Sequence, residues 1–299
     1  MTECYRIIDQ HALDDLAAGP PPVLVMHFEG WIDAGYSAAA AVHQLTEPLD
    51  RHTVVDFDSD MLLDYRARRP VLRLVDGKHR AMTWPGIRLE VAHLASGQPL
   101  MLLTGHEPDF RWHAFADAVV DIASEAGVRL AVGFGAFPAP VPHTRTVGVA
   151  TSSSGDEPLT TLGSGIGYVP GDVEVPAGVE AVLEQHFEMH GITAVGLWAR
   201  VPHYVAGSNY PAASLALLEA FGTLAGSQVD VGSLPDEARM ARLHLDHLLE
   251  NSEEHTEMVR QLEESIDSDG DEVGPRIVDG PLPSGDEIAA ELERFLRDQ

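Results

Sequence analysis

Histidines, carboxylates and arginines follow several predicted strands at the point where each apolar run ends. Such groups can perform acid–base chemistry, because a carboxylate can orient a histidine while an arginine holds an anion. In open α/β sheets, ligands bind beyond the carboxyl ends of the parallel strands. We therefore expect one crevice lined by Glu29, Asp33, His106, Glu107, Arg111, Trp112, His143, Arg145, His203 and Tyr204. The alternative is that these groups cap helices, satisfy buried backbone or line a subunit interface.

No complete catalytic or metal-binding motif accompanies this set. His186 and His190 have the one-turn spacing of zinc-binding helices, but Phe187 stands where a zinc peptidase has glutamate, so we expect a solvated helix face. The acidic stretch that begins at Asp267 has Glu272 where a calcium loop needs glycine, which indicates a linker. The sequence thus predicts no metal and no cofactor. It leaves enzymatic activity undecided and favours a protein without one.

The charge balance excludes two classes of partner. The formal charge is −28, from 19 basic and 47 acidic residues. A surface of this sign repels phosphate backbones and anionic lipids, so neither nucleic acid nor a membrane is expected as a partner. The longest apolar runs, such as Leu100–Leu103, are too short to span a bilayer. The first residues lack a signal-peptide pattern and Cys4 is a lone cysteine, so we expect a cytoplasmic protein.

Apolar runs alternate with helical patterns along the chain, as they do in α/β proteins. The runs predict strands at Val23–Phe28, Thr53–Asp58, Pro99–Thr104, Leu130–Ala136, Arg145–Thr151 and Ala194–Arg200. The helical patterns predict helices at Tyr36–Leu49, from an N-cap at Asp109 to Ala126, at Val179–His190 and at Pro211–Leu224. This alternation predicts a mainly parallel, doubly wound sheet.

An antiparallel insertion interrupts this pattern. Val71–Val75 and His79–Thr83 flank an Asp-Gly pair, a two-residue turn in which glycine adopts positive φ. Ile87–Leu94 alternates apolar and polar residues, as a half-buried strand does. Tyr65 and Arg66 stand just before the hairpin, and we expect them at an interface with a neighbouring subunit, because the hairpin suits edge-to-edge contact.

The character of the chain changes near residue 235, which divides it into a core domain, 1–234, and an acidic helical extension, 235–299. The pattern of charged and apolar residues over Glu237–Glu264 predicts one long amphipathic helix. Residues 265–285 are rich in Asp, Gly and Pro, which predicts a mobile linker, and a short helix follows to Gln299.

Four phrases in order resemble the motifs of one family, the actinobacterial branch of the proteasome-assembly-chaperone-2 family. They are Phe28-Glu-Gly-Trp-Ile-Asp-Ala-Gly35, Asp64-Tyr-Arg66 with Arg69-Pro70, Gly105-His-Glu-Pro-Asp-Phe-Arg-Trp112 and Pro142-His-Thr-Arg145. The resemblance covers roughly Val23 to Leu234. It implies a three-layer α/β/α fold related to nucleoside phosphorylases and peptidyl hydrolases, and self-association, with a trimer favoured.

The resemblance also implies proteasome core subunits as partners. Eukaryotic members of the family dock on the proteasome α-ring through a C-terminal hydrophobic-Tyr-any tripeptide. This chain ends Leu296-Arg-Asp-Gln299, so we do not expect docking by that route. The family supplies no catalytic residue set to carry over.

Two hypotheses about function follow. The first, which we favour, is a homo-oligomeric assembly or interaction factor, related to the proteasome. The second is a hydrolase or phosphorylase-like enzyme acting on an anionic substrate in the crevice. In the second, Arg111 and Arg145 bind the anion, and a histidine–carboxylate pair drawn from His106, Glu107, His143 and His203 moves protons. It requires those side chains to lie within hydrogen-bond reach of one reacting group.

Overall fold

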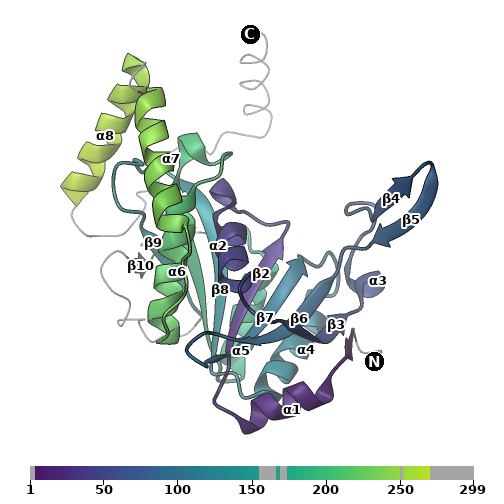
Figure 1. The fold of residues 1–299 in the computed structure, drawn as a ribbon. Coiled ribbons are helices and arrows are strands. Elements are labelled where there is room, and N and C mark those ends of the chain that lie inside the picture. The colour runs from purple at the N-terminus through teal and green to yellow at the C-terminus, as the bar shows by residue number, and fades with distance from the viewer. Residues whose placement is uncertain (1–3, 155–165, 169–173, 250–251, 270–299) are drawn as a thin grey trace.

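The computed structural model describes residues 4–154, 166–168, 174–249 and 252–269 of the chain. They form a nine-stranded sheet in the order β1-β3-β6-β7-β2-β8-β11-β9-β10 (Figure 1). Its centre consists of four parallel strands: β7 (Pro99–His106), β2 (Val23–Glu29), β8 (Leu130–Ala139) and β11 (Thr193–Pro202). The predicted mainly parallel α/β sheet is confirmed.

Antiparallel strands extend the sheet at both sides. On one side β6 (Ile87–His93) pairs with β7, β3 (His52–Phe57) with β6, and β1 (Tyr5–Ile7) with β3. On the other side β9 (Val149–Ser152) runs antiparallel to β11, and β10 (Ile166–Tyr168) parallel to β9. β1 and the helix α1 (Gln10–Ala18) that follows it were not predicted from the sequence.

Helices cover both faces of the sheet, which explains why its central strands are apolar at consecutive positions. In β2, Leu24 and Met26 belong to the core under α4 (Trp112–Glu125) and α5 (Val179–Met189). The alternate residues Val23 and Val25 belong to the core under α2 (Ser37–Thr46) and α6 (Pro211–Ala225). The three-layer architecture is therefore confirmed. No helix in the part of the chain that the structure describes combines the length and apolarity needed to cross a membrane.

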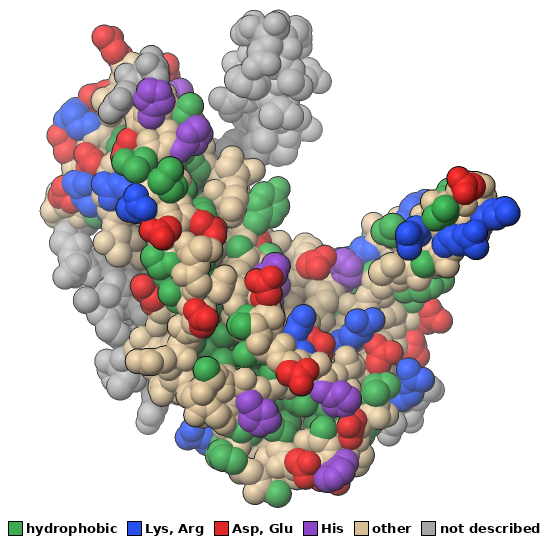
Figure 2. All heavy atoms as spheres, in the orientation of Figure 1, with side chains coloured by type: hydrophobic (Ala, Val, Ile, Leu, Met, Phe, Trp, Pro, Cys, Tyr) green, Lys and Arg blue, Asp and Glu red, His purple; other side chains and the backbone are tan. Residues whose placement is uncertain are grey.

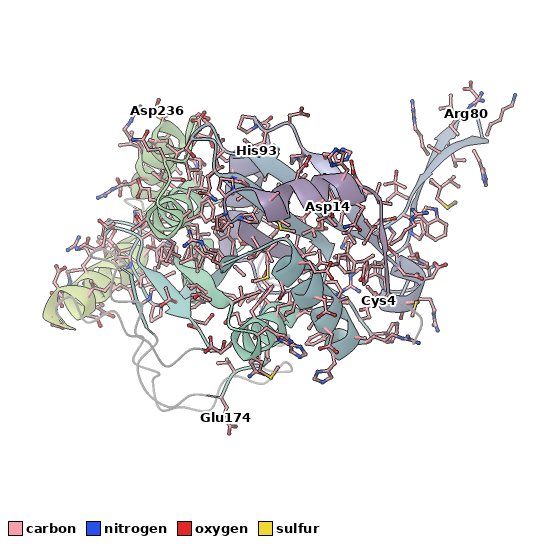
Figure 3. All side chains as sticks on the ribbon, turned by 90° about the horizontal axis from the view of Figure 1, so that it is seen from below. Cys4, Asp14, Arg80, His93, Glu174 and Asp236 are labelled. Carbon is pink, nitrogen blue, oxygen red and sulfur yellow. The ribbon has the colours of Figure 1, made fainter. Side chains whose placement is uncertain are left out.

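The predicted hairpin is present as a separate two-stranded sheet, β4 (Val71–Val75) with β5 (Lys78–Thr83). Both turn residues have positive φ, 51° at Asp76 and 73° at Gly77, as a two-residue turn with right-handed strand twist requires. The hairpin projects from the body, and Arg80 lies at its far end (Figures 1 and 3). We call β4 and β5 the arm.

The described part of the extension, up to residue 269, contains two helices, so the prediction of one helix over Glu237–Glu264 is wrong. α7 (Leu234–Leu249) and α8 (Glu253–Asp269) are separate, and α8 enters the stretch 265–285 predicted as a linker. Ser252, followed by Glu253 and Glu254, indicates the start of α8, since helix N-termini favour serine caps and acidic first turns. The apolar periodicity of the sequence runs across this point and therefore did not reveal it. The predicted helix near the chain end lies outside the described residues.

Candidate functional site

The residues expected to line one crevice follow β2, β7, β8 and β11, and these strands are parallel neighbours whose carboxyl ends share one edge of the sheet. At this edge the side chains separate into two groups. One gathers at the ends of β2 and β7, and the other at the ends of β8 and β11. In the part of the chain that the structure describes, no hydrogen bond or ion pair joins the two groups.

In the first group, two of the three carboxylates stabilise helices. Asp33 accepts hydrogen bonds from the backbone N–H groups of Ala38 (2.8 Å) and Ala39 (3.0 Å) in the first turn of α2. Glu107 is buried, and its Oε1 accepts the N–H of Val179, the first residue of α5, at 2.8 Å. A carboxylate at a helix N-terminus satisfies free N–H groups and complements the helix dipole. These two residues therefore fit the alternative interpretation, helix capping.

The remaining carboxylate of this group, Glu29, contacts a histidine, although the predicted histidine–carboxylate pair had Glu107 as its carboxylate. His106 Nδ1 lies 3.4 Å from Glu29 Oε2, and the Glu29 side chain is 68% exposed. Asp109, expected as the N-cap of α4, instead accepts the backbone N–H of Asp64 (2.7 Å) and pairs with Arg68. The hydrogen bond from Arg68 lowers the pKa of Asp109 against the opposing effect of burial.

Two residues at the same edge of the sheet, each directly before a helix, have a strained backbone conformation. Tyr36 and Arg111, which precede α2 and α4, have φ of 52° and 60°, a conformation that side chains with a Cβ rarely adopt. The Trp112 indole N–H donates to the carbonyl of Pro108, which ties the second loop together. Around these loops large apolar side chains are exposed: Trp31 38%, Ile32 43%, Tyr36 62% and Phe110 51%.

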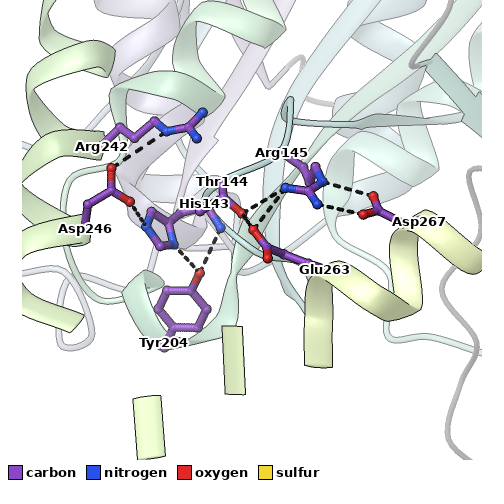
Figure 4. A network of polar contacts seen from close by, with 8 residues as sticks. All are labelled: His143, Thr144, Arg145, Tyr204, Arg242, Asp246, Glu263 and Asp267. Carbon is purple, nitrogen blue, oxygen red and sulfur yellow. Dashed lines mark hydrogen bonds and ion pairs between the residues drawn. The ribbon is translucent and has the colours of Figure 1, made fainter. Parts of the chain in front are cut away.

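The second group forms a network that includes the helical extension (Figure 4). His143 is buried; its Nε2 lies 3.0 Å from Asp246 Oδ1 in α7, and its Nδ1 2.8 Å from the Tyr204 hydroxyl. The backbone N–H of His143 also donates to that hydroxyl at 2.8 Å. In the tautomer whose Nε2–H donates to Asp246, Nδ1 accepts a hydrogen bond from the Tyr204 hydroxyl. Burial raises the pKa of Tyr204, so its hydroxyl stays protonated.

Arg145 lies under α8 rather than in a strand, because β9 begins only at Val149 and not at the predicted Arg145. Its Nε and Nη2 contact Asp267 Oδ1 and Oδ2 at 3.0 and 2.7 Å, and its Nη1 contacts Glu263 Oε1 at 3.0 Å (Figure 4). The hydrogen bond with Asp267 raises the pKa of Arg145. The His203 ring meets the Tyr204 ring edge-on, with centroids 5.3 Å apart.

A pocket of about 380 Å³ lies between the extension and the start of α6. Its lining includes Tyr204 and Tyr210, with Leu245 and Leu248 from α7 and Met258 from α8. It is thus an apolar pocket of the size that small ligands occupy, with the Tyr204 end of the His143 network in its wall.

Two buried carboxyls on α5, Glu180 and Glu184, were not predicted from the sequence. Glu184 Oε1 accepts from the Ser152 hydroxyl at 3.2 Å, and Ser152 in turn accepts from the Trp198 indole at 3.0 Å. Burial raises the pKa of Glu184 to about 7. Burial, reinforced by the charge of Glu184, raises the pKa of Glu180 well above its ordinary value.

Glycines in the sheet provide the space for these carboxyls, and they are the sequence signal that could have revealed them. A Cβ added at Gly133 would lie 2.6 Å from Glu180 Oε2, and one at Gly196 would lie 2.7 Å from Glu184 Oε1. Gly in the interior of a strand often marks such a close approach. His186 on the same helix is buried with its Nδ1 3.1 Å from Asp117 Oδ1, so the predicted solvated face is wrong there.

Tyr65 and Arg66 lie where the arm leaves the body. Tyr65 is half-buried, with its ring edge-on to Trp84 at a centroid distance of 4.9 Å, whereas Arg66 is exposed. Burial, reinforced by the nearby Asp60, raises the pKa of Tyr65 to about 12. Their role at an interface stays a prediction.

Comparisons with known proteins identify close structural relatives. A Streptomyces avermitilis protein described as a PAC2 family protein is 34% identical with a TM-score of 0.68, over 80% of this chain and 99% of that chain. The Mycobacterium tuberculosis proteasome-assembly chaperone homologue Rv2125 is 32% identical with a TM-score of 0.71, over 79% of this chain and 99% of that one. Rv2714 from the same organism, of unknown function, is 32% identical with a TM-score of 0.78, over 92% and 94%. The search of curated proteins found no match.

The family model described as the PAC2 family matches residues 27–249. This range contains the end of β2, the arm, both groups of the sheet edge and α7, while α8 lies beyond it. Together with the relatives above, the match shows that this chain belongs to the PAC2 family.

Proposed function

We propose that this protein is a homo-oligomeric assembly factor, and that the arm packs against a second copy of the chain. The observation that carries the proposal is the exposure of the arm. Every residue of β5 is exposed, and apolar side chains of both strands face solvent, among them Val71 (69%), Leu74 (54%) and Met82 (46%). An isolated two-stranded hairpin is marginally stable in water, so such an arm is best accounted for by a partner surface that covers it.

The charge of the arm favours a second copy as that partner. The arm carries three basic residues, Arg73, Lys78 and Arg80, and a single acidic residue, Asp76, and three more arginines stand just before it at positions 66, 68 and 69. Figure 2 shows basic side chains gathered along the arm. The rest of the chain carries nearly all of the 47 acidic residues. A basic, partly apolar arm and an acidic body are complementary, which favours association between identical chains.

Reversing the charge of the arm is expected to dissociate the oligomer. The variant Arg73→Glu/Lys78→Glu/Arg80→Glu places three acidic groups against an acidic body, and like charges brought together at an interface are costly. Sedimentation equilibrium at micromolar concentration should give an oligomer for the wild type, with the trimer as the expected state, and a monomer for the variant.

The matched control reverses three exposed arginines elsewhere, Arg6, Arg129 and Arg239, and should sediment like the wild type. A monomeric wild type would overturn the self-association. An arm variant that keeps the wild-type mass would show that the arm is not the interface.

We further propose that the assembly partner is a proteasome core subunit. Support comes from membership of the PAC2 family and from the name of Rv2125, a proteasome-assembly chaperone homologue. The exposed Trp31, Ile32, Tyr36 and Phe110 lie on loops after the neighbouring strands β2 and β7, and a group of large apolar side chains is typical of protein-binding surfaces.

This partner is testable with purified proteasome α subunits. Wild-type protein should retain unassembled α subunits at low and at moderate salt, and Trp31→Ser/Phe110→Ser should retain at least tenfold less, because buried aromatic anchors dominate binding at interfaces. Val175→Ser, which removes another exposed apolar side chain, is the control. Equal retention by all three proteins would exclude this surface, and no retention by the wild type would exclude the partner.

A further inference from the structure

We propose that Thr144 and Arg145 form a docking site for an acidic helical segment of a partner protein, and that α8 occupies this site in the free chain. This inference goes beyond the proposed self-association and does not depend on the arm. It rests on the contacts that hold α8, on where the site lies in the sheet, and on how weakly α8 is anchored.

The contacts form an arginine fork with a carboxylate pair. The two Asp267 oxygens meet Arg145 Nε and Nη2 at 3.0 and 2.7 Å, which is bidentate recognition. Glu263 is four residues earlier on the same face of α8; it meets Arg145 Nη1 at 3.0 Å and also accepts from the Thr144 hydroxyl. The site therefore recognises two carboxylates that are separated by one helical turn.

The position of the site is that of a ligand site in this fold class. Thr144 and Arg145 follow β8, one of the central parallel strands, at the carboxyl edge where open α/β sheets bind their ligands. Both residues lie inside the range 27–249 that matches the PAC2 family, whereas α8, Glu253–Asp269, lies beyond it. The receptor thus lies within the range that the family model matches, and its present occupant lies beyond that range.

The contacts that fix α8 are weak enough for another segment to displace it. Among the described residues of α8, only Val259 is buried, and its two docking carboxylates, Glu263 and Asp267, are 28% and 57% exposed. Ion pairs exposed to this degree contribute little net stability, because water and salt screen them. A segment of another protein with the same carboxylate spacing can therefore replace α8.

The test uses the full-length chain and a fluorescent peptide with the sequence of α8. In the double variant Glu263→Gln/Asp267→Asn, α8 keeps its length and loses both docking charges. Fluorescence anisotropy at 150 mM NaCl, where long-range repulsion by the acidic body is screened beyond about 8 Å, measures peptide binding. We expect the double variant to bind the peptide at least tenfold more tightly than the wild type. Adding Arg145→Met should return binding to the wild-type level.

A matched control separates the two docking charges from the general acidity of the helix. Glu257 and Glu264 pair with Arg260 inside α8 and do not touch the site. Glu257→Gln/Glu264→Gln should therefore bind the peptide no better than the wild type. Equal binding by all chains, binding that survives Arg145→Met, or no binding to the double variant at millimolar peptide would each overturn the proposal.

Discussion

Replacing Glu184 by glutamine is expected to stabilise the protein at pH 8 and to flatten the dependence of its stability on pH. Glu184, a residue of α5, is buried and accepts a hydrogen bond from Ser152. Its pKa is about 7, against an ordinary value of 4.5. Because its folded pKa is raised, the folded state holds the proton more tightly than the unfolded chain does. Its contribution to stability is therefore complete below about pH 4.5, falls as the pH rises to about 7, and stays lost above that.

The size of the effect follows from the interval between the two pKa values. At about 1.36 kcal/mol per pH unit, the wild type loses about 3 kcal/mol between pH 4.5 and 7 through this one carboxyl. Glutamine keeps the shape and carries no charge, so the difference in unfolding free energy between variant and wild type should grow by that amount over this range. Urea unfolding at intervals of half a pH unit measures it.

Glu188, one turn further along α5 and exposed, provides the control. Glu188→Gln should run parallel to the wild type at every pH. Glu180, whose pKa is also raised, contributes a slope of the same sign to all three proteins, and in Glu184→Gln this slope is smaller because the charge of Glu184 no longer reinforces the shift, so the change at Glu180 flattens the pH dependence further. Parallel curves for Glu184→Gln and the wild type would show that Glu184 is solvated and charged in the folded state.

Replacing Gly105 by alanine is expected to cost at least about 3 kcal/mol of folding stability, from overpacking together with backbone strain. Gly105 lies in β7 opposite Ile87, with φ of 140°. A Cβ there would be 2.1 Å from the carbonyl oxygen of Gly86 and 2.7 Å from the Ile87 Cα. Both are backbone atoms, so no side-chain rotation relieves the clash, and β6 must separate from β7. Thermal and urea unfolding report the loss.

Gly127 distinguishes the clash from the strain. It also has positive φ, 76°, but a Cβ would meet nothing within 4 Å. Gly127→Ala should therefore cost only about 1–2 kcal/mol, the ordinary penalty for a side chain in that conformation. If the two variants lose equal stability, the close approach of β6 at Gly105 is not what requires glycine.

The arm and the central strands show how much of the fold local patterning predicts. Continuous apolar residues over Val23–Phe28 predict a strand buried on both faces, and an Asp-Gly pair between two strands predicts the hairpin; both are confirmed. The sequence pattern did not predict the break between α7 and α8, because Leu249 and Met258 continue the apolar pattern on either side of it. Helix starts depend on a few capping residues, and periodicity over a long window averages them out.

The polar groups at the sheet edge show what local sequence patterns cannot predict, namely the partners that these groups meet in the folded chain. Strand and helix patterns depend on residues two to four apart, so the sequence was sufficient to place Glu107, His143 and Arg145 after parallel strands that share one edge. Their partners come from distant elements: Val179 is 72 residues from Glu107, Asp246 is 103 from His143, and Glu263 is 118 from Arg145. The tertiary packing of α5, α7 and α8 therefore decided which partners these groups meet: Glu107 caps a helix, and His143 and Arg145 hold the extension. A polar group pairs with whatever folding brings within about 3 Å of it, and no spacing along the chain records that distance.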